Sequence, residues 1–144
     1  MKTLPLFLLA ITFVAPAHAD PAAVAGTWMN EDGDGLIEIR IDGQDIRGTI
    51  IGSPIEDPER PTTDIHNPDA ALRDRPLVGL TILSGFSYDG DGAWSGGFVY
   101  DPNNGKTYRA KLKLADRNTL KLRGYIGISL LGRTETWTRQ KTET

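Results

Sequence analysis

Apolar and polar residues alternate along most of the chain after residue 25, and clusters of Gly, Asp and Asn interrupt the alternation repeatedly. A hydrophobic period of two indicates β-strands with one buried face, and the interrupting residues favour tight turns. We predict eight strands, at residues 26–31, 35–41, 45–51, 78–88, 93–101, 106–115, 119–126 and 132–140. Eight strands joined mostly by short turns favour an all-β fold, namely an eight-stranded up-and-down antiparallel barrel.

The alternation also assigns one face of each strand to the core. The residues expected to point inward are Ile37, Ile39, Ile41, Tyr108, Ala110, Leu112, Leu114, Leu120, Leu122 and Ile126. Three glycines, Gly48, Gly96 and Gly124, fall on the same face. A strand glycine either permits the sharp coiling that a small barrel needs or leaves interior volume for a ligand, and coiling is the better supported reason.

Residues 1–19 have the organisation of a secretory signal peptide. A positive charge at Lys2 precedes an apolar run from Leu4 to Val14, and Ala17-His18-Ala19 forms the small-x-small pattern before a cleavage site. The apolar run is short for a bilayer span, and no second one follows. The absence of cysteine excludes a lipobox acylation site, disulfides, thiolate metal sites and a cysteine nucleophile. We expect cleavage after Ala19, one domain at residues 20–144, and a periplasmic or secreted protein without an integral membrane segment.

The charge balance gives no sign of a nucleic-acid partner. The chain has 16 basic and 19 acidic residues, a net charge of −3. In the linear sequence the basic residues are interleaved with acids and form no stripe. We interpret the pairs Arg73/Arg75 and Lys111/Lys113 as solvated strand or loop positions.

Three blocks in the second half of the chain carry a family resemblance: Asn67 to Gly79, Tyr100 to Tyr108, and Arg123 to Arg139. Their residues and order resemble a family of small exported bacterial proteins catalogued as domain of unknown function 2147. The resemblance implies a lipocalin- and avidin-like (calycin) β-barrel and an exported protein. It implies no particular chemistry.

A second resemblance concerns the two ends of the barrel sequence. Gly26-Thr-Trp28 opens the first strand, and in lipocalin-like barrels a Gly-x-Trp at this place is similar to the signature whose indole closes one barrel end beneath a basic residue of the last strand. Arg139 is the matching basic residue. Antiparallel closure places the start of the first strand beside the end of the last, so we expect a structural cation–π contact between Trp28 and Arg139.

The last strand has no apolar face in either register. Arg133, Glu135, Trp137 and Arg139 lie on one side, and threonines lie on the other. Burying Trp137 therefore brings charges inward, and Arg133 should pair with Glu135 because an isolated buried charge is too costly. Such a pair is either a structural lock or a polar anchor for a ligand head group.

Residues 52–77 form a long proline-rich loop, far longer than a hairpin connection. Asn67, Pro68 and Asp69 favour the start of a helical turn. Arg73 and Arg75 follow it, and a family-like Leu-Arg-x-Arg-Pro-Leu-x-Gly pattern surrounds them. The loop is either a lid locked by arginine–carboxylate bonds or a clamp for an anionic group, with the lock slightly favoured. The candidate carboxylate partners are Asp64, Asp69 and Asp101.

Catalytic and metal chemistry find little support. Apart from the signal peptide, the chain has one histidine, His66, and none of its serines lies in a Gly-x-Ser-x-Gly elbow. The two Asp-Gly-Asp-Gly segments lack the downstream glutamate of a calcium loop, so turn chemistry explains them. We expect no enzyme activity, no cofactor and no metal site.

The sequence favours the binding of a small apolar or amphipathic molecule where the long loop meets the barrel mouth, by analogy with similar barrels. The residues expected to line the site are Trp94, Tyr100, Tyr108, Arg133 and Trp137. The alternative is a protein-interaction module of the cell envelope that uses the long loop or the apolar bend from Tyr125 to Leu131. An open lumen would favour the ligand, and a filled barrel with an apolar outer patch would favour interaction.

Overall fold

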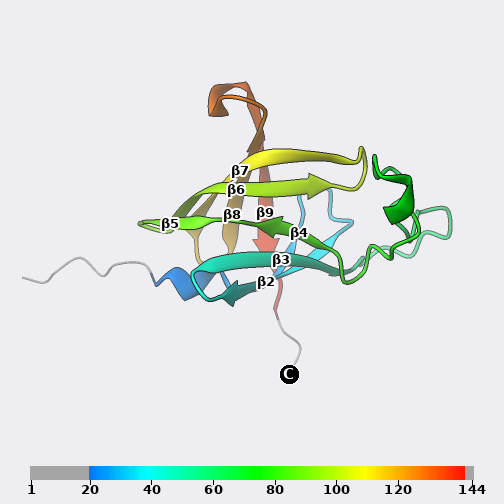
Figure 1. The fold of residues 1–144 in the computed structure, drawn as a ribbon. Coiled ribbons are helices and arrows are strands. Elements are labelled where there is room, and N and C mark those ends of the chain that lie inside the picture. Colours follow the sequence, from blue (N-terminus) through cyan, green and yellow to red (C-terminus); the bar gives the residue numbers. More distant parts are fainter. Residues whose placement is uncertain (1–19, 142–144) are drawn as a thin grey trace, which may run out of the picture.

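The computed structural model describes residues 20–141, which form one nine-stranded antiparallel sheet (Figure 1). The strands are β1 (Gly26–Met29), β2 (Leu36–Asp42), β3 (Asp45–Gly52), β4 (Thr81–Ser84), β5 (Ser87–Gly90), β6 (Ala93–Asp101), β7 (Lys106–Asp116), β8 (Thr119–Tyr125) and β9 (Gly132–Arg139). Three short 3-10 helices are η1 (Pro21–Val24), η2 (Ala70–Leu72) and η3 (Ser129–Leu131). No helix within residues 20–141 has the length and apolar character needed to cross a membrane.

The sheet closes on itself. Its strand order is β4-β3-β2-β1-β9-β8-β7-β6-β5, and β4 also pairs with β6. This pairing closes eight strands into a barrel and leaves β5 as an extension that pairs with β6. The predicted all-β antiparallel barrel of eight strands is confirmed. The predicted signal peptide lies outside the described residues.

The segment expected as one strand at residues 78–88 is divided into β4 and β5. The backbone turns at Gly85 and Phe86, whose N–H groups donate to the carboxylate of Asp45 at 3.0 and 2.8 Å. These bonds replace the ladder bonds that a continuous strand would have made. The turn sends the Phe86 side chain into the core, where it is 3% exposed.

The barrel interior is packed with side chains. Its buried residues are Val24, Trp28, Ile37, Ile39, Ile46, Leu83, Phe86, Trp94, Ala110, Leu112, Leu120, Leu122 and Trp137, each at most 4% exposed. Two predicted core residues are wrong: Ile41 is 41% exposed and Ile126 is 66% exposed. Ile41 lies beside the β2–β3 turn, beyond the packed interior, and Ile126 follows the end of β8, so neither has a facing layer of side chains.

A β-bulge in β6 corrects the predicted inward set. The register with β7 shifts between Trp94 and Gly97, and Gly96 has a φ of 73°. An extra residue in one strand reverses the alternation beyond it. Gly96 is therefore exposed, and Gly97 takes the inward position against the ring of Phe86. Beyond the bulge, Val99 points inward, whereas the side chains on either side of it belong to the outer face.

The expected contact at one barrel end is present. Trp28 is fully buried, and the guanidinium carbon of Arg139 lies 4.4 Å from its ring centroid. The indole donates to the carbonyl oxygen of Val24 at 2.9 Å, and Arg139 Nη1 donates to that of Ala25 at 2.7 Å. Burial lowers the pKa of Arg139 from its ordinary value. Arg139 thus joins β9 to the segment that enters β1.

The pairing of β7 with β8 corrects the interpretation that the basic residues form no stripe. Lys111 stands opposite Arg123, and Lys113 stands opposite Lys121. Arg109 precedes them on the same outward face of β7. Asp116 is the one acid between Arg109 and Arg123 in the sequence, and it lies at the β7–β8 turn, so five cations share one outer surface.

Candidate functional site

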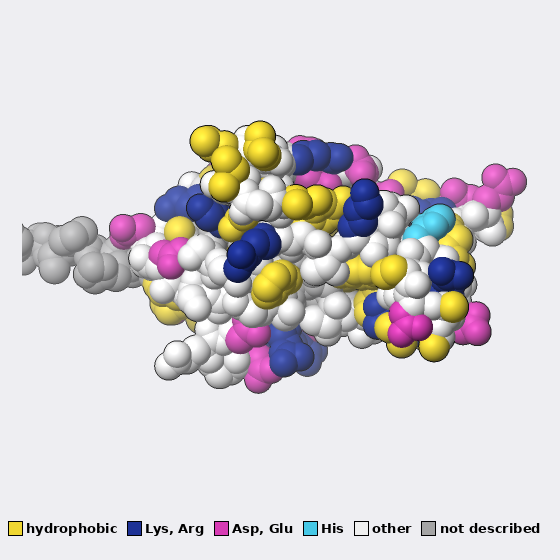
Figure 2. Space-filling model, turned by 45° about the horizontal axis from the view of Figure 1, so that its top comes forward, with side chains coloured by type: hydrophobic (Ala, Val, Ile, Leu, Met, Phe, Trp, Pro, Cys, Tyr) yellow, Lys and Arg dark blue, Asp and Glu magenta, His cyan; other side chains and the backbone are white. Residues whose placement is uncertain are grey.

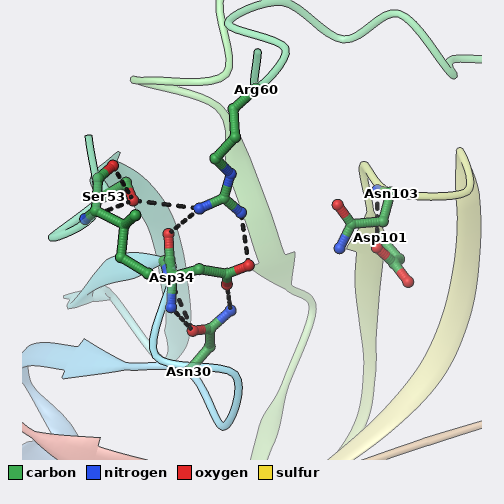
Figure 3. A network of polar contacts seen from close by, with 8 residues as sticks. Asn30, Asp34, Ser53, Arg60, Asp101 and Asn103 are labelled. Carbon is green, nitrogen blue, oxygen red and sulfur yellow. Dashed lines mark hydrogen bonds and ion pairs between the residues drawn. The ribbon is translucent and has the colours of Figure 1, made fainter. Parts of the chain in front are cut away.

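The long loop, residues 53–80, is fixed to the β1–β2 turn by Arg60 (Figure 3). Arg60 Nη2 pairs with Asp34 Oδ2 at 2.6 Å, and Nη1 donates to the backbone oxygen of Asp34 at 3.1 Å. Asn30 holds the other oxygen of this carboxylate, because its Nδ2 donates to Asp34 Oδ1 at 2.7 Å. This aspartate of the first Asp-Gly-Asp-Gly segment therefore serves as an anchor for the loop.

The second attachment of the loop is centred on Asp64, which is fully buried. Tyr100 of β6 donates its hydroxyl proton to Asp64 Oδ1 at 2.6 Å. Asn67 Nδ2 and Arg75 Nε both donate to Asp64 Oδ2 at 2.8 Å. Arg75 also lies over the Tyr100 ring, with 5.6 Å between its guanidinium carbon and the ring centroid. The predicted arginine–carboxylate bond is present between Arg75 and Asp64.

The surroundings of Asp64 keep it ionised. Burial raises the pKa of this carboxyl, but the hydrogen bonds from Tyr100, Asn67 and Arg75 and the charge of Arg75 outweigh burial, and the net pKa lies below its usual range. Burial and the Asp64 carboxylate raise the pKa of Tyr100. Both carboxylate oxygens of Asp64 accept hydrogen bonds from side chains of the protein. This carboxylate therefore acts as a fixed hydrogen-bond acceptor rather than as a general base.

The loop also contacts the β6–β7 turn at close range. Gly105 has a φ of 73°, and a Cβ atom there would lie 1.9 Å from the carbonyl oxygen of His66. Only glycine allows this approach of two backbones. The first and second sequence blocks, around Asn67 and Gly105, therefore meet in space. The β6–β7 turn of the second block thus supports the loop segment of the first block.

The short helix in the loop is close to its prediction. It spans Ala70–Leu72, and its N-cap is Asp69, whose side chain accepts from the Ala71 N–H at 3.0 Å. Asn67, expected as the cap, instead accepts from the Asp69 N–H at 2.8 Å and donates to Asp64. Arg73 binds no carboxylate in the described chain; its Nε donates to the Asn67 carbonyl oxygen at 2.8 Å.

A groove of about 330 Å³ lies between the long loop and the outer wall of the barrel. We call it the loop groove; its lining residues are Asn67, Pro68, Arg75, Thr81, Ile82, Ser84, Phe98, Tyr100, Gly105 and Thr107. Phe98, 44% exposed, and Ile82 give it an apolar floor. At its edge, Arg75 uses Nε for Asp64, while its two terminal nitrogens make no hydrogen bond with the described residues. The groove thus combines an apolar surface with an immobilised cation.

The five residues predicted to line one ligand site do not come together. Trp94 pairs with Leu112 and packs against Tyr88 near the β5–β6 turn, with ring centroids 5.0 Å apart and ring planes tilted by 49°. Tyr100 lies toward the other end of β6, on the outer face, because the bulge at Gly96 separates it from the inward positions. Tyr108 is opposite Val99 and belongs to the inward set. Strict alternation placed the three rings on one inward face, because the sequence pattern does not show the bulge that reverses the alternation after Trp94.

The predicted residues of the last strand occupy a third place. Trp137 is 2% exposed, and its Nε1 donates to Glu135 at 3.0 Å. Arg133 pairs with Glu135 at 3.2 Å, as expected, but its side chain is 72% exposed rather than enclosed. The pair lies at the barrel rim, so the lumen holds no buried charge pair from these residues.

A second hollow, of about 660 Å³, opens at the opposite barrel end between η1, the β2–β3 turn and β5. Trp94 and Phe86 form part of its wall, and Asp20 and Pro21 border it. Both hollows thus open at the outer surface or the rim. Within residues 20–141 there is no cluster of three or more potential metal ligands among His, Cys, Asp and Glu.

Comparison with known proteins agrees with this architecture. The chain is similar in structure to protein HP1028 from the human pathogen Helicobacter pylori, described as belonging to the lipocalin family, with 23% sequence identity, a TM-score of 0.73, and coverage of 81% of this chain and 82% of that chain. A redesigned β-barrel shares 17% identity with a TM-score of 0.46, covering 84% of this chain and 95% of that chain. No curated protein sequence matches the chain. Residues 26–139 match the family described as "Uncharacterized protein conserved in bacteria (DUF2147)", and the chain belongs to this family with a lipocalin-like barrel.

Proposed function

We propose that the protein binds a small amphipathic molecule with an acidic head, and that the site is the loop groove rather than the barrel lumen. The observation that carries the proposal is Arg75, which lines the groove, donates through Nε to Asp64, and makes no hydrogen bond to residues 20–141 through its two terminal nitrogens. A guanidinium held in this way presents two parallel donors to a carboxylate. The lipocalin-like fold adds support by analogy alone.

The shape of the groove limits the ligand. Its volume of about 330 Å³ is near the lower end of small-molecule sites. Phe98 and Ile82 would contact an aromatic ring or a short aliphatic chain, while Thr81, Ser84 and Thr107 supply hydroxyl groups at the edges. We infer a compact aromatic or short aliphatic carboxylate, and we infer that it meets the protein outside the cell membrane after export and cleavage at Ala19.

The direct test is a titration of the purified protein with benzoate, phenylacetate and hexanoate, each compared with its neutral alcohol or amide. Chemical-shift changes of amides in the long loop and at Phe98 should appear with the acids and be weak with the neutral analogues. Thr107→Trp should abolish them, because Thr107 is exposed and lines the groove, where an indole would compete with the ligand for space. Thr138→Trp, on the exposed face of β9, is the matched control.

Two results would contradict the proposal. One is the absence of any shift in the loop with all three acids. The other is binding that survives Thr107→Trp, which would place the ligand elsewhere, for example in the hollow beside Trp94.

A second candidate function is attachment to a component of the cell envelope. The observation that favours it is the connection between β8 and β9, whose apolar side chains are exposed while the barrel interior is packed. Exposed apolar patches of this kind mark interaction surfaces.

A further inference from the structure

The β8–β9 connection projects from the barrel and presents four exposed aliphatic side chains. Ile126, Ile128, Leu130 and Leu131, here called the apolar tip, are 66%, 58%, 84% and 76% exposed. Figure 1 shows this connection standing clear of the barrel, and Figure 2 shows hydrophobic side chains gathered where it projects. A convex group of aliphatic side chains has no surrounding wall with which to hold a small molecule.

Hydrogen bonds connect the apolar tip to the outer face of β8 and to β9. Arg123 points outward from β8, and its Nε donates to the carbonyl oxygen of Ser129 at 2.6 Å. Its Nη1 donates to Thr134 at 2.8 Å, which ties the tip to β9. The Leu131 N–H donates to the Ile128 carbonyl oxygen at 3.1 Å, closing a turn inside the connection. These bonds place the tip beside Arg123, at one end of the outer face of β8.

That wall carries the five cations that the β7–β8 register assembles. Arg109, Lys111, Lys113, Lys121 and Arg123, here called the basic face, make no ion pair in the described chain. Two cross-strand pairs, Lys111 with Arg123 and Lys113 with Lys121, place like charges directly opposite one another. Such pairs destabilise a sheet. None of the ion pairs in the described chain neutralises these five cations, so they remain available to an anionic partner.

The acids near the basic face lie at its edges. Asp116 interacts electrostatically with Lys121, and the backbone oxygen of Asp91 accepts from Lys113, both at the end of the strands far from the tip. Glu31 lies on the β9 side, 4.0 Å from Arg133. At the end of the basic face that meets the apolar tip, Arg109 and Arg123 make no ion pair with an acid of residues 20–141. Figure 2 shows lysine and arginine side chains on the surface below the projecting hydrophobic group.

We propose that the apolar tip and the basic face together dock on an anionic phospholipid surface, with the tip among the acyl chains and the cations against the head groups. Aliphatic side chains next to unpaired Lys and Arg are the combination that binds anionic membranes peripherally. A nucleic acid offers no apolar layer for the tip, and a protein partner would require a groove complementary to four projecting aliphatic groups. This inference makes the envelope attachment specific and is independent of the groove ligand.

The test is sedimentation with phosphatidylcholine vesicles, with or without about a third phosphatidylglycerol. The protein starting at Asp20 should partition onto the anionic vesicles at least about 25-fold more strongly, since each cation near the surface contributes roughly fivefold and two of the five suffice for that factor. The preference should disappear at about 0.5 M salt, where screening is strong. Equal partitioning onto both vesicles, or none onto either, would overturn the proposal.

Two variants separate the contributions, and each has a matched control. Leu130→Ser with Leu131→Ser should lower vesicle binding by about tenfold or more, whereas the same change at the exposed Ile55 and Val78 should leave it unaltered. Lys111→Gln with Lys113→Gln should lower binding and also raise thermal stability, because it removes like-charge pairs. Arg40→Gln with Arg47→Gln makes the same change in net charge on β2 and β3.

The outcomes distinguish a failed lipid proposal from failed envelope attachment. Loss of binding in the control variants to the same degree would overturn the assignment of the surface. If vesicles do not bind the protein but cell fractionation still finds it with membranes in a manner that depends on Leu130 and Leu131, the partner is a protein and the lipid proposal is wrong. Binding to a DNA duplex without binding to vesicles would equally overturn it.

Discussion

The hydrogen bonds of Asp64 with Tyr100, Asn67 and Arg75, here called the loop lock, attach the long loop to β6. Replacement of Asp64 by Asn tests their physical basis. The change keeps the shape of the side chain and removes its charge. In the unmutated protein, three groups donate to the carboxylate: Tyr100 at 2.6 Å, and Asn67 and Arg75 at 2.8 Å. An amide cannot accept from all of them, and its own N–H₂ group would face a donor.

The expected loss follows from the contacts. Hydrogen bonds to a charged group contribute about 1.5–3 kcal/mol each, and removing one partner of a buried ion pair costs about 3–5 kcal/mol. The Arg75 side chain is 35% exposed, so water compensates it in part and the estimate must be reduced. We expect Asp64→Asn to lower the free energy of unfolding by about 2–4 kcal/mol near neutral pH, a large share of ordinary domain stability.

The pH dependence has a definite sign. The pKa of Asp64 is lower in the folded protein than its usual value, so its stabilising contribution is complete above the unfolded pKa of about 3.9 and is lost as the pH falls through the folded value. The difference in unfolding free energy between the native protein and Asp64→Asn should therefore shrink at acid pH. Urea denaturation followed by circular dichroism, at neutral and at acid pH, measures it.

A protease assay reports on the loop itself. Residues 53–80 contain Arg60, Arg73 and Arg75 and no lysine, and Arg60 and Arg75 precede proline, before which trypsin does not cut. Cleavage after Arg73 should accelerate in Asp64→Asn. Asp57→Asn, an exposed change in the same loop, is the control. A stability loss below about 0.5 kcal/mol, within the range of ordinary surface changes, together with unchanged cleavage, would refute the reasoning.

Two further changes address the barrel end and the loop contact. Trp28→Ala should cost about 3–5 kcal/mol, as truncation of a buried aromatic does, and a double-mutant cycle with Arg139→Ala should show coupling of about 0.5 kcal/mol or more in urea denaturation. Strict additivity would argue against the contact, which the structure places at 4.4 Å. Gly105→Ala should accelerate tryptic cleavage of the loop, because the new Cβ would lie 1.9 Å from the His66 oxygen. Gly33→Ala has a similar φ of 72° with no atom within 4 Å and isolates backbone strain; equal effects of the two changes on the loop would exclude the steric explanation.

The features predicted correctly from the sequence depend on local patterns or on barrel closure. Alternation gave the eight barrel strands, because a half-buried strand leaves its period in the sequence. The contact of Trp28 with Arg139 follows once the first and last strands are known to be neighbours. The sequence offered Asp64 as one of three candidate carboxylate partners of Arg73 and Arg75. Apart from its position between Pro61 and Pro68, nothing in the sequence indicated that Asp64 is buried.

The features that the sequence did not predict depend on register. The like-charge pairs of β7 and β8 become visible only when Lys111 is set opposite Arg123, and each basic residue alone resembles an ordinary solvated position. The groove residues Phe98 and Ile82 were missed for a related reason. The register shifts in the pairing of β4 with β3 and of β6 with β7 change which side chains face outward, compared with strict alternation. In the sequence, the adjacent glycines at 96 and 97 were the only sign of such an irregularity.

The bulge at Gly96 links the packed interior to the outer groove. It brings Gly97, which has no side chain, against the Phe86 ring, and it also turns Tyr100 outward to meet Asp64. A Cβ atom added at Gly96 would meet no other atom within 4 Å, so a substitution there acts through the positive φ. If the bulge positions Tyr100, a β-branched residue at position 96, which disfavours positive φ, should weaken the loop lock.

Gly96→Val should therefore accelerate tryptic cleavage after Arg73. Gly43→Val introduces comparable strain, at a φ of 64° with no atom within 4 Å, in the β2–β3 turn at the other barrel end. Cleavage after Arg73 should respond to the change at Gly96 and be nearly indifferent to the change at Gly43, when both variants are compared at temperatures equally far below their melting points. Equal cleavage rates would mean that the lock does not depend on the bulge, and that the outward position of Tyr100 is set instead by Asp64 and the loop.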